Sequence, residues 1–165
     1  MRKILYTIGL AALMSSAALA GSASNTFTSN ATVASVCLIQ SATLNFNTVA
    51  TVALSAATQS TTTISVACTN GMPAPNITMT KGTNGTGTDA APVRHLKNTV
   101  TTDLLTYHLY SESGYSTEWT NTNVLFPTTP DGTYQTMTVY GQVDGAQHSV
   151  PAGSYTDAVT VSVVF

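Results

Sequence analysis

The sequence contains few charged residues. Asp, Glu, Lys and Arg make up 7% of the 165 residues, and the formal net charge is −2. No cluster of bases is present that could neutralise a row of phosphates, so we expect no binding to nucleic acid. A surface of hydroxyl and amide groups fits close packing against other copies of the chain. It fits a low-charge extracellular domain equally well, and composition leaves both interpretations open.

Long apolar runs are also missing, except at the N-terminus. Two bases precede the apolar stretch 4–12, and Ala18-Leu19-Ala20 has the small-x-small form of a signal-peptide cleavage site. We expect residues 1–20 to be a secretory signal peptide and the mature chain to begin at Gly21. No other segment approaches the roughly 18 apolar residues that a membrane helix needs. We therefore expect an exported product that does not insert into a membrane.

Cysteine is scarce, and the two present are Cys37 and Cys68. In the oxidising compartment that a secretory signal implies, a disulfide is the default for such a pair. It would close a loop of about 32 residues and stabilise the fold by roughly 3.5 kcal/mol through the entropy of the unfolded chain. The spacing fits no short metal-binding motif.

The sequence lacks the residue patterns of catalytic and metal sites. Its histidines, His95, His108 and His148, show no metal-ligand spacing, and no serine stands in a Gly-x-Ser-x-Gly motif. We expect His108 to be a surface or partly buried strand residue. The acids occur singly, and we expect Asp157 to hydrogen-bond local backbone. The predicted protein is therefore not an enzyme and has no cofactor or metal.

What the sequence does contain is apolar residues at every second position, the period of a half-buried strand. Turn residues separate the alternating segments, and no helical period follows the signal peptide. This pattern predicts an all-β sandwich of short strands. The clearest predicted strands are residues 61–69, 76–81, 104–110 and 137–143.

The alternation is cleanest at the C-terminus, within Tyr155–Phe165. One face of this predicted strand carries Val159, Val161, Val163 and Phe165, and the other carries Thr160 and Ser162. A β domain that ends in such a strand is expected to leave one sheet edge open.

A second alternating segment lies just after the predicted signal peptide. One of its faces carries Phe27, Ser29, Ala31 and Val33, and the other carries Thr28, Asn30 and Thr32. A spare strand and an open edge in one chain suggest a subunit that polymerises by donating its strand to a neighbour.

Several further segments form a recognisable set. They are Ser65-Val-Ala-Cys68, Arg94-His95-Leu96, Leu105-Thr-Tyr-His-Leu-Tyr110, Trp119, Met137-Thr-Val-Tyr-Gly-Gln142 and the C-terminal Pro151–Phe165. Together they resemble the spore coat protein U family, which includes the pilins of archaic chaperone–usher pili. The resemblance covers essentially the whole mature chain. One departure is Phe46-Asn47, where family members often have Phe-Gly.

The resemblance implies an incomplete immunoglobulin-like sandwich that lacks its last strand and is completed by donor-strand exchange. Residues 21–35 would be the donor segment and residues 36–165 the pilin domain. The implied partners are other pilin subunits, a periplasmic chaperone and an outer-membrane usher, and the implied location is a pilus or coat at the cell surface. Phe27, Ser29, Ala31 and Val33 would enter a neighbour's acceptor groove. That groove would be lined by Val159, Val161, Val163 and Phe165.

Two alternatives remain open at this stage. The protein would be a sugar- or surface-binding adhesin module if its aromatic side chains formed a ligand platform, although such residues also fill ordinary sandwich cores. It would be a self-complemented monomer if its own N-terminal strand folded back into its groove. The aromatic residues concerned are Tyr107, Tyr110, Tyr115, Trp119, Tyr134 and Tyr140.

Overall fold

The computed structural model describes residues 21–122 and 124–165. The chain divides into two units, residues 1–32 and residues 33–165. The described part of the first unit, residues 21–32, is exposed and forms neither helix nor strand. The predicted signal peptide, residues 1–20, lies outside the described residues.

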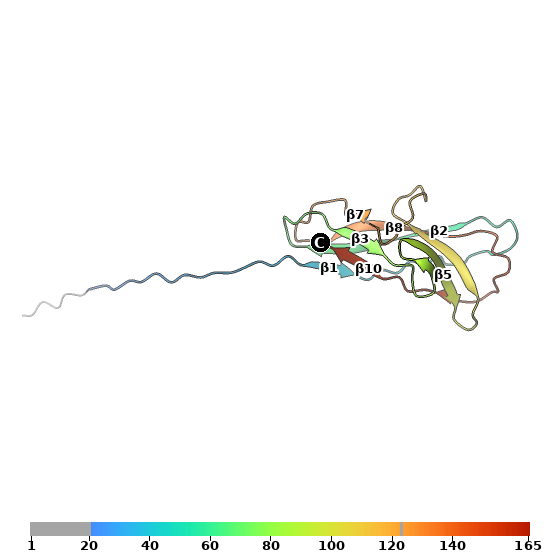
Figure 1. Ribbon diagram of the computed structural model, residues 1–165, viewed down its shortest axis with the longest axis horizontal. Coiled ribbons are helices and arrows are strands. Elements are labelled where there is room, and N and C mark those ends of the chain that lie inside the picture. Colours follow the sequence, from blue (N-terminus) through green and yellow to red (C-terminus); the bar gives the residue numbers. More distant parts are fainter. Residues whose placement is uncertain (1–20, 123) are drawn as a thin grey trace, which may run out of the picture. The chain divides into compact units, whose positions relative to one another are not determined.

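The second unit is built of antiparallel strands in two sheets (Figure 1). The larger sheet has the order β1-β2-β8-β6-β5-β4, with β9 also paired to β5, and the smaller has the order β10-β3-β7. The described residues contain no helix, and so none that could span a membrane. The strands are β1 (Cys37–Gln40), β2 (Thr58–Cys68), β3 (Asn76–Met79), β4 (Thr86–Thr88), β5 (Ala91–Asn98), β6 (Leu104–Tyr110), β7 (Val124–Leu125), β8 (Gln135–Val143), β9 (Tyr155–Thr156) and β10 (Val161–Val164).

The core lies between the two sheets and consists of inward positions that the alternation predicts, together with Trp119 and Phe126, which lie outside the strands. Four of the observed strands, β2, β3, β6 and β8, occupy the segments predicted for them. The all-β prediction is therefore confirmed. The buried core residues are Ile64, Val66, Cys68, Ile77, Met79, Leu105, Tyr107, Leu109, Trp119, Phe126, Val139 and Val143.

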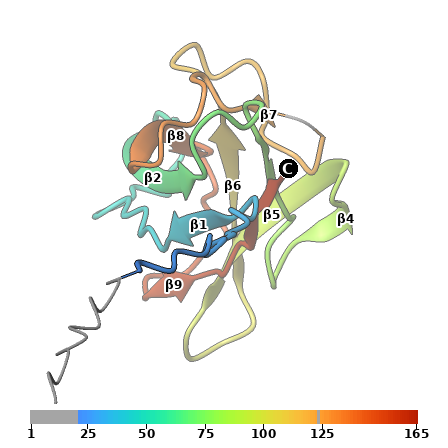
Figure 2. The same ribbon diagram turned by 90° about the vertical axis from the view of Figure 1, so that its left-hand side faces the viewer.

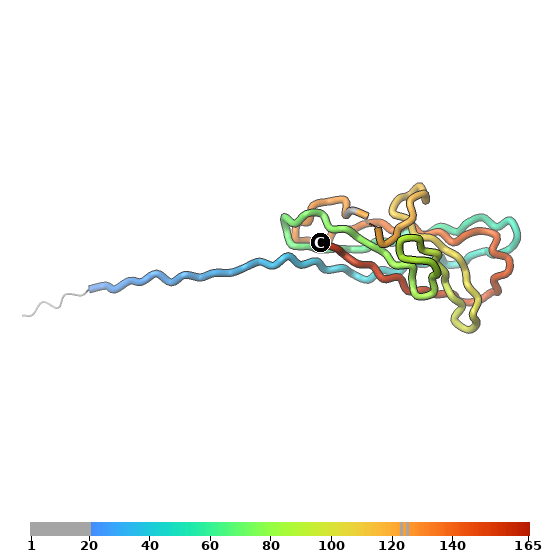
Figure 3. Tube along the Cα trace, in the orientation of Figure 1, coloured from blue at the N-terminus to red at the C-terminus, as the bar shows by residue number. Residues whose placement is uncertain are grey.

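The C-terminal segment differs from its prediction as one continuous strand. It forms β9, which pairs with β5, and then β10, which pairs with β3 in the other sheet. The red end of the tube in Figure 3 shows the path of this segment to the C-terminus. The break falls at Asp157, whose carboxylate accepts hydrogen bonds from the Tyr107 hydroxyl at 2.8 Å and the Asn84 amide at 3.0 Å. Asp157 thus binds distant parts of the chain and not the local backbone that we expected. The segment changes sheets because these bonds hold it between them.

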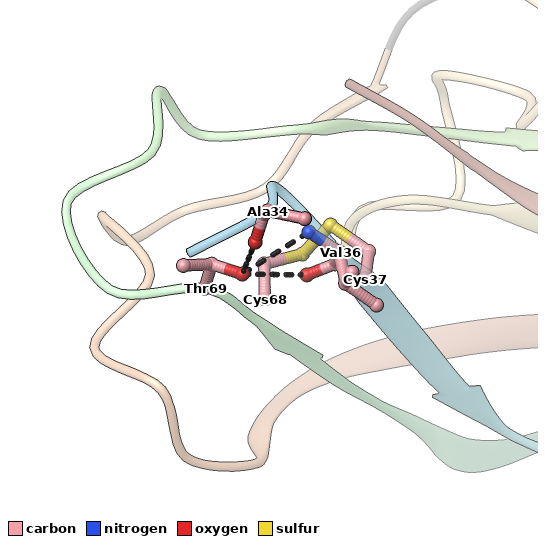
Figure 4. The surroundings of a disulfide bond; sticks show 5 residues. All are labelled: Ala34, Val36, Cys37, Cys68 and Thr69. Carbon is pink, nitrogen blue, oxygen red and sulfur yellow. Dashed lines mark hydrogen bonds between the residues drawn. A yellow bond between two sulfur atoms is a disulfide. The ribbon is translucent and has the colours of Figure 1, made fainter. Parts of the chain in front are cut away.

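Cys37 and Cys68 form the predicted disulfide, opposite each other on β1 and β2 (Figure 4). Next to it, Thr69 holds the residues that lead into β1. Its hydroxyl donates to the Ala34 carbonyl at 3.1 Å and accepts from the Val36 amide, while its own amide donates to the Val36 carbonyl at 2.9 Å. The disulfide and Thr69 together fix the start of β1 on β2.

The segment 117–120 joins the two sheets on one side of the sandwich. The Trp119 amide donates to Leu109 of β6 at 2.7 Å, and the Thr120 carbonyl accepts from Met79 of β3 at 2.9 Å. The Trp119 side chain is fully buried, and its indole Nε1 donates to the Ile77 carbonyl at 3.0 Å. Residues from both sheets therefore contact Trp119, and this side of the core is closed.

Arg94 reinforces the same region from β5, and its guanidinium is fully buried. It donates to the carbonyls of Thr80 and Trp119, at 2.9 and 2.6 Å, and to the Glu118 carboxylate at 3.1 Å. Burial lowers the pKa of Arg94, and the nearby carboxylate of Glu118 opposes that shift. We call Arg94 together with residues 117–120 the latch.

Candidate functional site

The structure leaves one region of the core uncovered, where the edge strands β1 and β10 come close together (Figure 1, Figure 2). β1 ends the larger sheet and β10 ends the smaller one. Their inward residues are less buried than those of the central strands. Ile39 of β1 faces the same side as Val66, yet it is 38% exposed against 2% for Val66. Val161 and Val163 of β10 are likewise only half-buried.

An open groove of about 770 Å³ runs along this uncovered core. One wall is the segment 42–49 after β1, and the other is the C-terminal segment around Val159 and Val161. The floor is apolar and comes from central strands of both sheets. Its residues are Ile64, Met79, Leu96, Leu105, Tyr107, Leu109 and Val139.

Residues 42–49 form the first wall without being part of a strand. Leu44 and Phe46 turn inward, and the Phe46 ring meets Tyr107 edge-on with ring centroids 6.1 Å apart. These two side chains can pack against β8 because Gly141 has no side chain there. A Cβ at Gly141 would collide with Leu44. Asn47 has φ 54°, a left-handed conformation that Asn tolerates better than most residues. Asn47 can therefore fill a position where the resembling family often has Gly.

One end of the groove is polar. The Tyr107 hydroxyl donates to Asp157, which also accepts from the backbone and side-chain amides of Asn84. Burial raises the pKa of Tyr107, and the charge of Asp157 and the bond to it add to the effect. Each of these side chains has a partner within the protein, so this network orders one end of the groove.

The predicted groove residues fall into two groups. Val159 and Val161 line the groove, and Val163 packs beside the core at half burial. Phe165 lies beyond β10 and is 63% exposed. With Val164 it borders a separate depression next to Met72 and Pro73. The inward alternation thus ends at Val163, and Phe165 does not join the groove.

The segment predicted as a donor strand is not part of either sheet. Phe27, Ser29, Ala31 and Val33 are all exposed, and the Phe27 side chain is 93% accessible. Large apolar residues of the groove that sequence reasoning missed are Leu44, Phe46 and Val49. The spacing of Leu44 and Phe46 at i and i+2 was a usable signal for them.

The described residues contain no group of three or more metal-ligating side chains. His108 lies on the outer face of β6, as expected, between two carboxylates. Its Nδ1 is 3.3 Å from Glu118 and its Nε2 is 3.4 Å from Asp144. The hydrogen bond to Glu118 is the main cause of the raised pKa of His108.

The chain is similar to known proteins in both sequence and fold. The family model described as the Spore Coat Protein U domain matches residues 23–162. Protein U of Myxococcus xanthus is 35% identical over 79 residues, which are 47% of this chain and 44% of that protein. The match thus spans less than half the length of this relative.

A solved structure shares the fold. It is the chaperone–tip adhesion subunit pre-assembly complex CsuC–CsuE from the archaic chaperone–usher Csu pili of Acinetobacter baumannii. The superposition has a TM-score of 0.58 and 24% sequence identity, and it covers 81% of this chain and 40% of that chain. The described architecture is therefore that of a chaperone–usher subunit fold.

Proposed function

The chain belongs to the family of spore coat protein U domains, and on this basis we propose that it is a structural subunit of a surface pilus or coat. Its copies polymerise by donor-strand complementation, in which residues 21–35 of one copy fill the groove of another. The observation that carries the proposal is the open groove between the segment 42–49 and the C-terminal segment that leads into β10, where the inward side chains of Val159 and Val161 are only partly buried.

The groove offers the two things that an added strand needs. Along one side, β10 is the last strand of its sheet and presents an unpaired edge for main-chain hydrogen bonds. Between the edges, an apolar floor can take every second side chain of an extended peptide. Phe27 and Val33 are the large apolar side chains on the matching face of the donor segment.

The lengths are also compatible. Residues 27–33 in an extended conformation span about 23 Å at roughly 3.3 Å per residue. The backbone edge presented by β10 and the residues before it, from Asp157 to Val164, is one residue longer. Burying Phe27 and Val33 contributes about 1.5–3 kcal/mol each, and several ladder hydrogen bonds add about 0.5–1.5 kcal/mol each. A junction of this kind is stable enough for a durable fibre.

The contacts of Thr69 favour donation between copies over self-complementation. To fill its own groove, the segment 27–33 would have to reverse direction just before β1. The residues available for that reversal include Ala34 and Val36, both of which Thr69 hydrogen-bonds beside the disulfide (Figure 4). A tight turn there would break these bonds. A second copy of the chain is therefore the better source of the strand.

The remaining partners follow from the same open edge. A subunit that exposes such a groove needs a protein to cover it before assembly. The fold neighbour was crystallised in a complex of a chaperone with a tip adhesion subunit. We extend this arrangement to the present chain: export through the periplasm, a chaperone in the groove, transfer at an outer-membrane usher, and display at the cell surface in adhesion or biofilm formation.

Two single substitutions in the donor segment test the proposal. Phe27→Asp would bring a charge into an apolar groove at a cost of several kcal/mol, and we expect it to abolish the heat-resistant ladders that polymers give on gels. Thr28→Asp is the matched control, because its side chain alternates to the opposite face, and its ladders should persist. Equal ladders from both variants would show that the segment is only a linker.

A truncated chain lacking residues 21–35 tests the groove itself. It should not polymerise, yet it should bind a synthetic peptide of residues 21–35 and gain thermal stability in doing so. If this truncated protein is a stable monomer that ignores the peptide, the groove is not a strand acceptor.

A further inference from the structure

The outer face of the larger sheet carries a second feature, on the opposite side of β6 and β8 from the groove. Tyr110 of β6 stands directly opposite Tyr140 of β8, and Tyr115 meets both rings edge-on. The ring centroids of Tyr115 lie 5.5 Å from Tyr110 and 6.0 Å from Tyr140. All three side chains are half-buried, so part of each ring faces solvent. We call these three residues the tyrosine cluster.

Tyr115 reaches the cluster from a loop that a single carboxylate organises. Glu112 accepts from the amides of Gly114, Ser116 and Thr117 at 2.6–2.8 Å and from the Ser116 hydroxyl. These hydrogen bonds lower the pKa of Glu112 to about 2, and the bond from the Ser116 amide has the largest effect. Tyr115 itself has φ 52°, which is costly for an aromatic residue. The loop is thus fixed in a conformation that holds the ring over the sheet.

The hydroxyls of the cluster are left without protein partners. Tyr107 and Tyr155 donate theirs to Asp157 and to the Pro151 carbonyl. Within residues 21–122 and 124–165, no such bond is formed by the hydroxyl of a cluster tyrosine. These three hydroxyls are therefore available to solvent or to a ligand.

Polar groups continue the surface next to the rings. Gln142 lies beside His108 and across from Gln59, and the two glutamines are hydrogen-bonded at 3.0 Å. Because Gln142 only accepts in this bond, both of its amide hydrogens and one lone pair of its oxygen stay available. The adjacent carboxylates of Glu118 and Asp144 each bind His108 through one oxygen. Charges near the cluster are therefore mostly compensated, while hydrogen-bonding groups remain available.

We propose that this face is a binding site for a neutral saccharide. Aromatic rings can pack against the apolar C–H face of a pyranose, while free phenols, amides and carboxylates match its hydroxyls. A phosphate or sulfate ligand would need free cations, and Arg94 and His108 are already paired with acids. The proposal goes beyond subunit assembly, because the residues of the site face away from the groove. It gives each subunit of a fibre a lateral glycan contact.

Affinity electrophoresis of the full secreted protein tests the site. The probes are three neutral polysaccharides, hydroxyethyl cellulose, galactomannan and amylose, with dextran sulfate as the charged comparison. We expect retardation by at least one neutral polymer, and a dissociation constant roughly tenfold weaker in Tyr115→Ala and in Gln142→Ala. Tyr115→Phe should retain most of the affinity because the ring remains.

Tyr134→Ala is the matched control, since Tyr134 is 49% exposed just before β8 and lies outside the cluster. Its retardation should equal that of the wild type, and the ladders of polymer should be unchanged in all four variants. Retardation by dextran sulfate alone, by no polymer, or equally in Tyr115→Ala and Tyr134→Ala would overturn the proposal. Loss of ladders with retained polysaccharide binding would count against the assembly model and not against this site.

Discussion

The latch and the groove are two regions of one core, and they differ in how deeply their inward-facing side chains are buried. At the latch, Trp119 and Arg94 are fully buried and bind backbone from both sheets. At the groove, Val159 and Val161 face inward and are only partly buried. Hydrophobic pattern therefore sets which way a side chain points, while the presence of a neighbouring strand sets how far it is buried.

The difference also suggests how one domain can be both stable and incomplete. A disulfide, a buried guanidinium and a central tryptophan fix the parts that are closed. In the proposed assembly, the stabilisation still missing is concentrated along the groove, where a neighbouring subunit would supply it. Substitutions at the latch should thus damage the isolated fold, and substitutions in the groove should damage mainly what binds there.

The largest effect is expected for Trp119→Ala. Removing a fully buried indole from the core leaves a cavity and an unpaired Ile77 carbonyl, and should lower the free energy of unfolding by about 4 kcal/mol. Phe165→Ala is the comparison from the open side, where 63% exposure predicts a loss below about 1 kcal/mol. Urea unfolding followed by circular dichroism measures both. Similar losses would mean that Phe165 is buried in the protein in solution.

Arg94→Met comes next, with an expected loss of about 3 kcal/mol. The methionine keeps much of the volume but leaves the carbonyls of Thr80 and Trp119 buried without a donor. Lys97→Met on the same strand is the control, because Lys97 is exposed and its replacement should change stability by less than about 0.5 kcal/mol. If Arg94→Met proves as stable as the wild type, the hydrogen bonds from the guanidinium to Thr80 and Trp119 do not stabilise the fold.

Much of the fold could be predicted from the sequence, because alternation is a local signal. The segments of β2, β3, β6 and β8 could be recognised from their own residues. β5 could not, because Arg94 occupies one of its buried positions and interrupts the apolar pattern. Only the contacts of Arg94 with Thr80, Trp119 and Glu118, which lie 14 to 25 positions away, make a guanidinium acceptable there.

The groove was predictable in outline but not in its boundaries. The cysteine pair followed from composition and compartment, and Val159 and Val161 followed from alternation. The change of sheets at Asp157 did not, because it depends on a hydroxyl from Tyr107 and an amide from Asn84. The wall at Leu44 and Phe46 depends on the missing side chain of Gly141. Each of these features is a contact between distant segments, which a local pattern does not encode.

A third prediction compares two valines, one fully buried in the closed core and one half-buried in the groove. Val143→Ala affects a closed position outside the groove lining, 0% exposed, and should cost about 2 kcal/mol of folding stability. Val161→Ala affects a half-buried groove position and should cost less than about 1 kcal/mol in the unpolymerised chain. The order should reverse when dissociation of a bound donor peptide is measured. Equal effects of the two variants on peptide release would contradict the assignment of Val161 to the acceptor wall.

The smallest expected effect is a pH dependence from His108. Its pKa is raised, first by the hydrogen bond to Glu118 and also by Asp144, with Arg94 and the Tyr110 ring as the other close groups. A raised folded-state pKa means that the stabilisation is fully present below the unfolded-state pKa of about 6.5 and is lost as the pH rises through the higher folded-state value. Because the side chain is partly exposed and therefore screened, we expect a change below about 1 kcal/mol.

Thermal unfolding measured in steps from pH 5 to pH 9 detects this change. The wild type should lose stability on the alkaline side of pH 6.5, and His108→Gln should flatten that part of the profile. His148→Gln is the matched control, since His148 is exposed and its Nδ1 lies 3.1 Å from the carbonyl oxygen of the nearby Ala146. Added salt should reduce the wild-type slope, because both carboxylates are within reach of solvent ions. If stability still falls with rising pH in His108→Gln, the pH dependence belongs to another group. The contacts of the imidazole with Glu118 and Asp144 would then not contribute to stability.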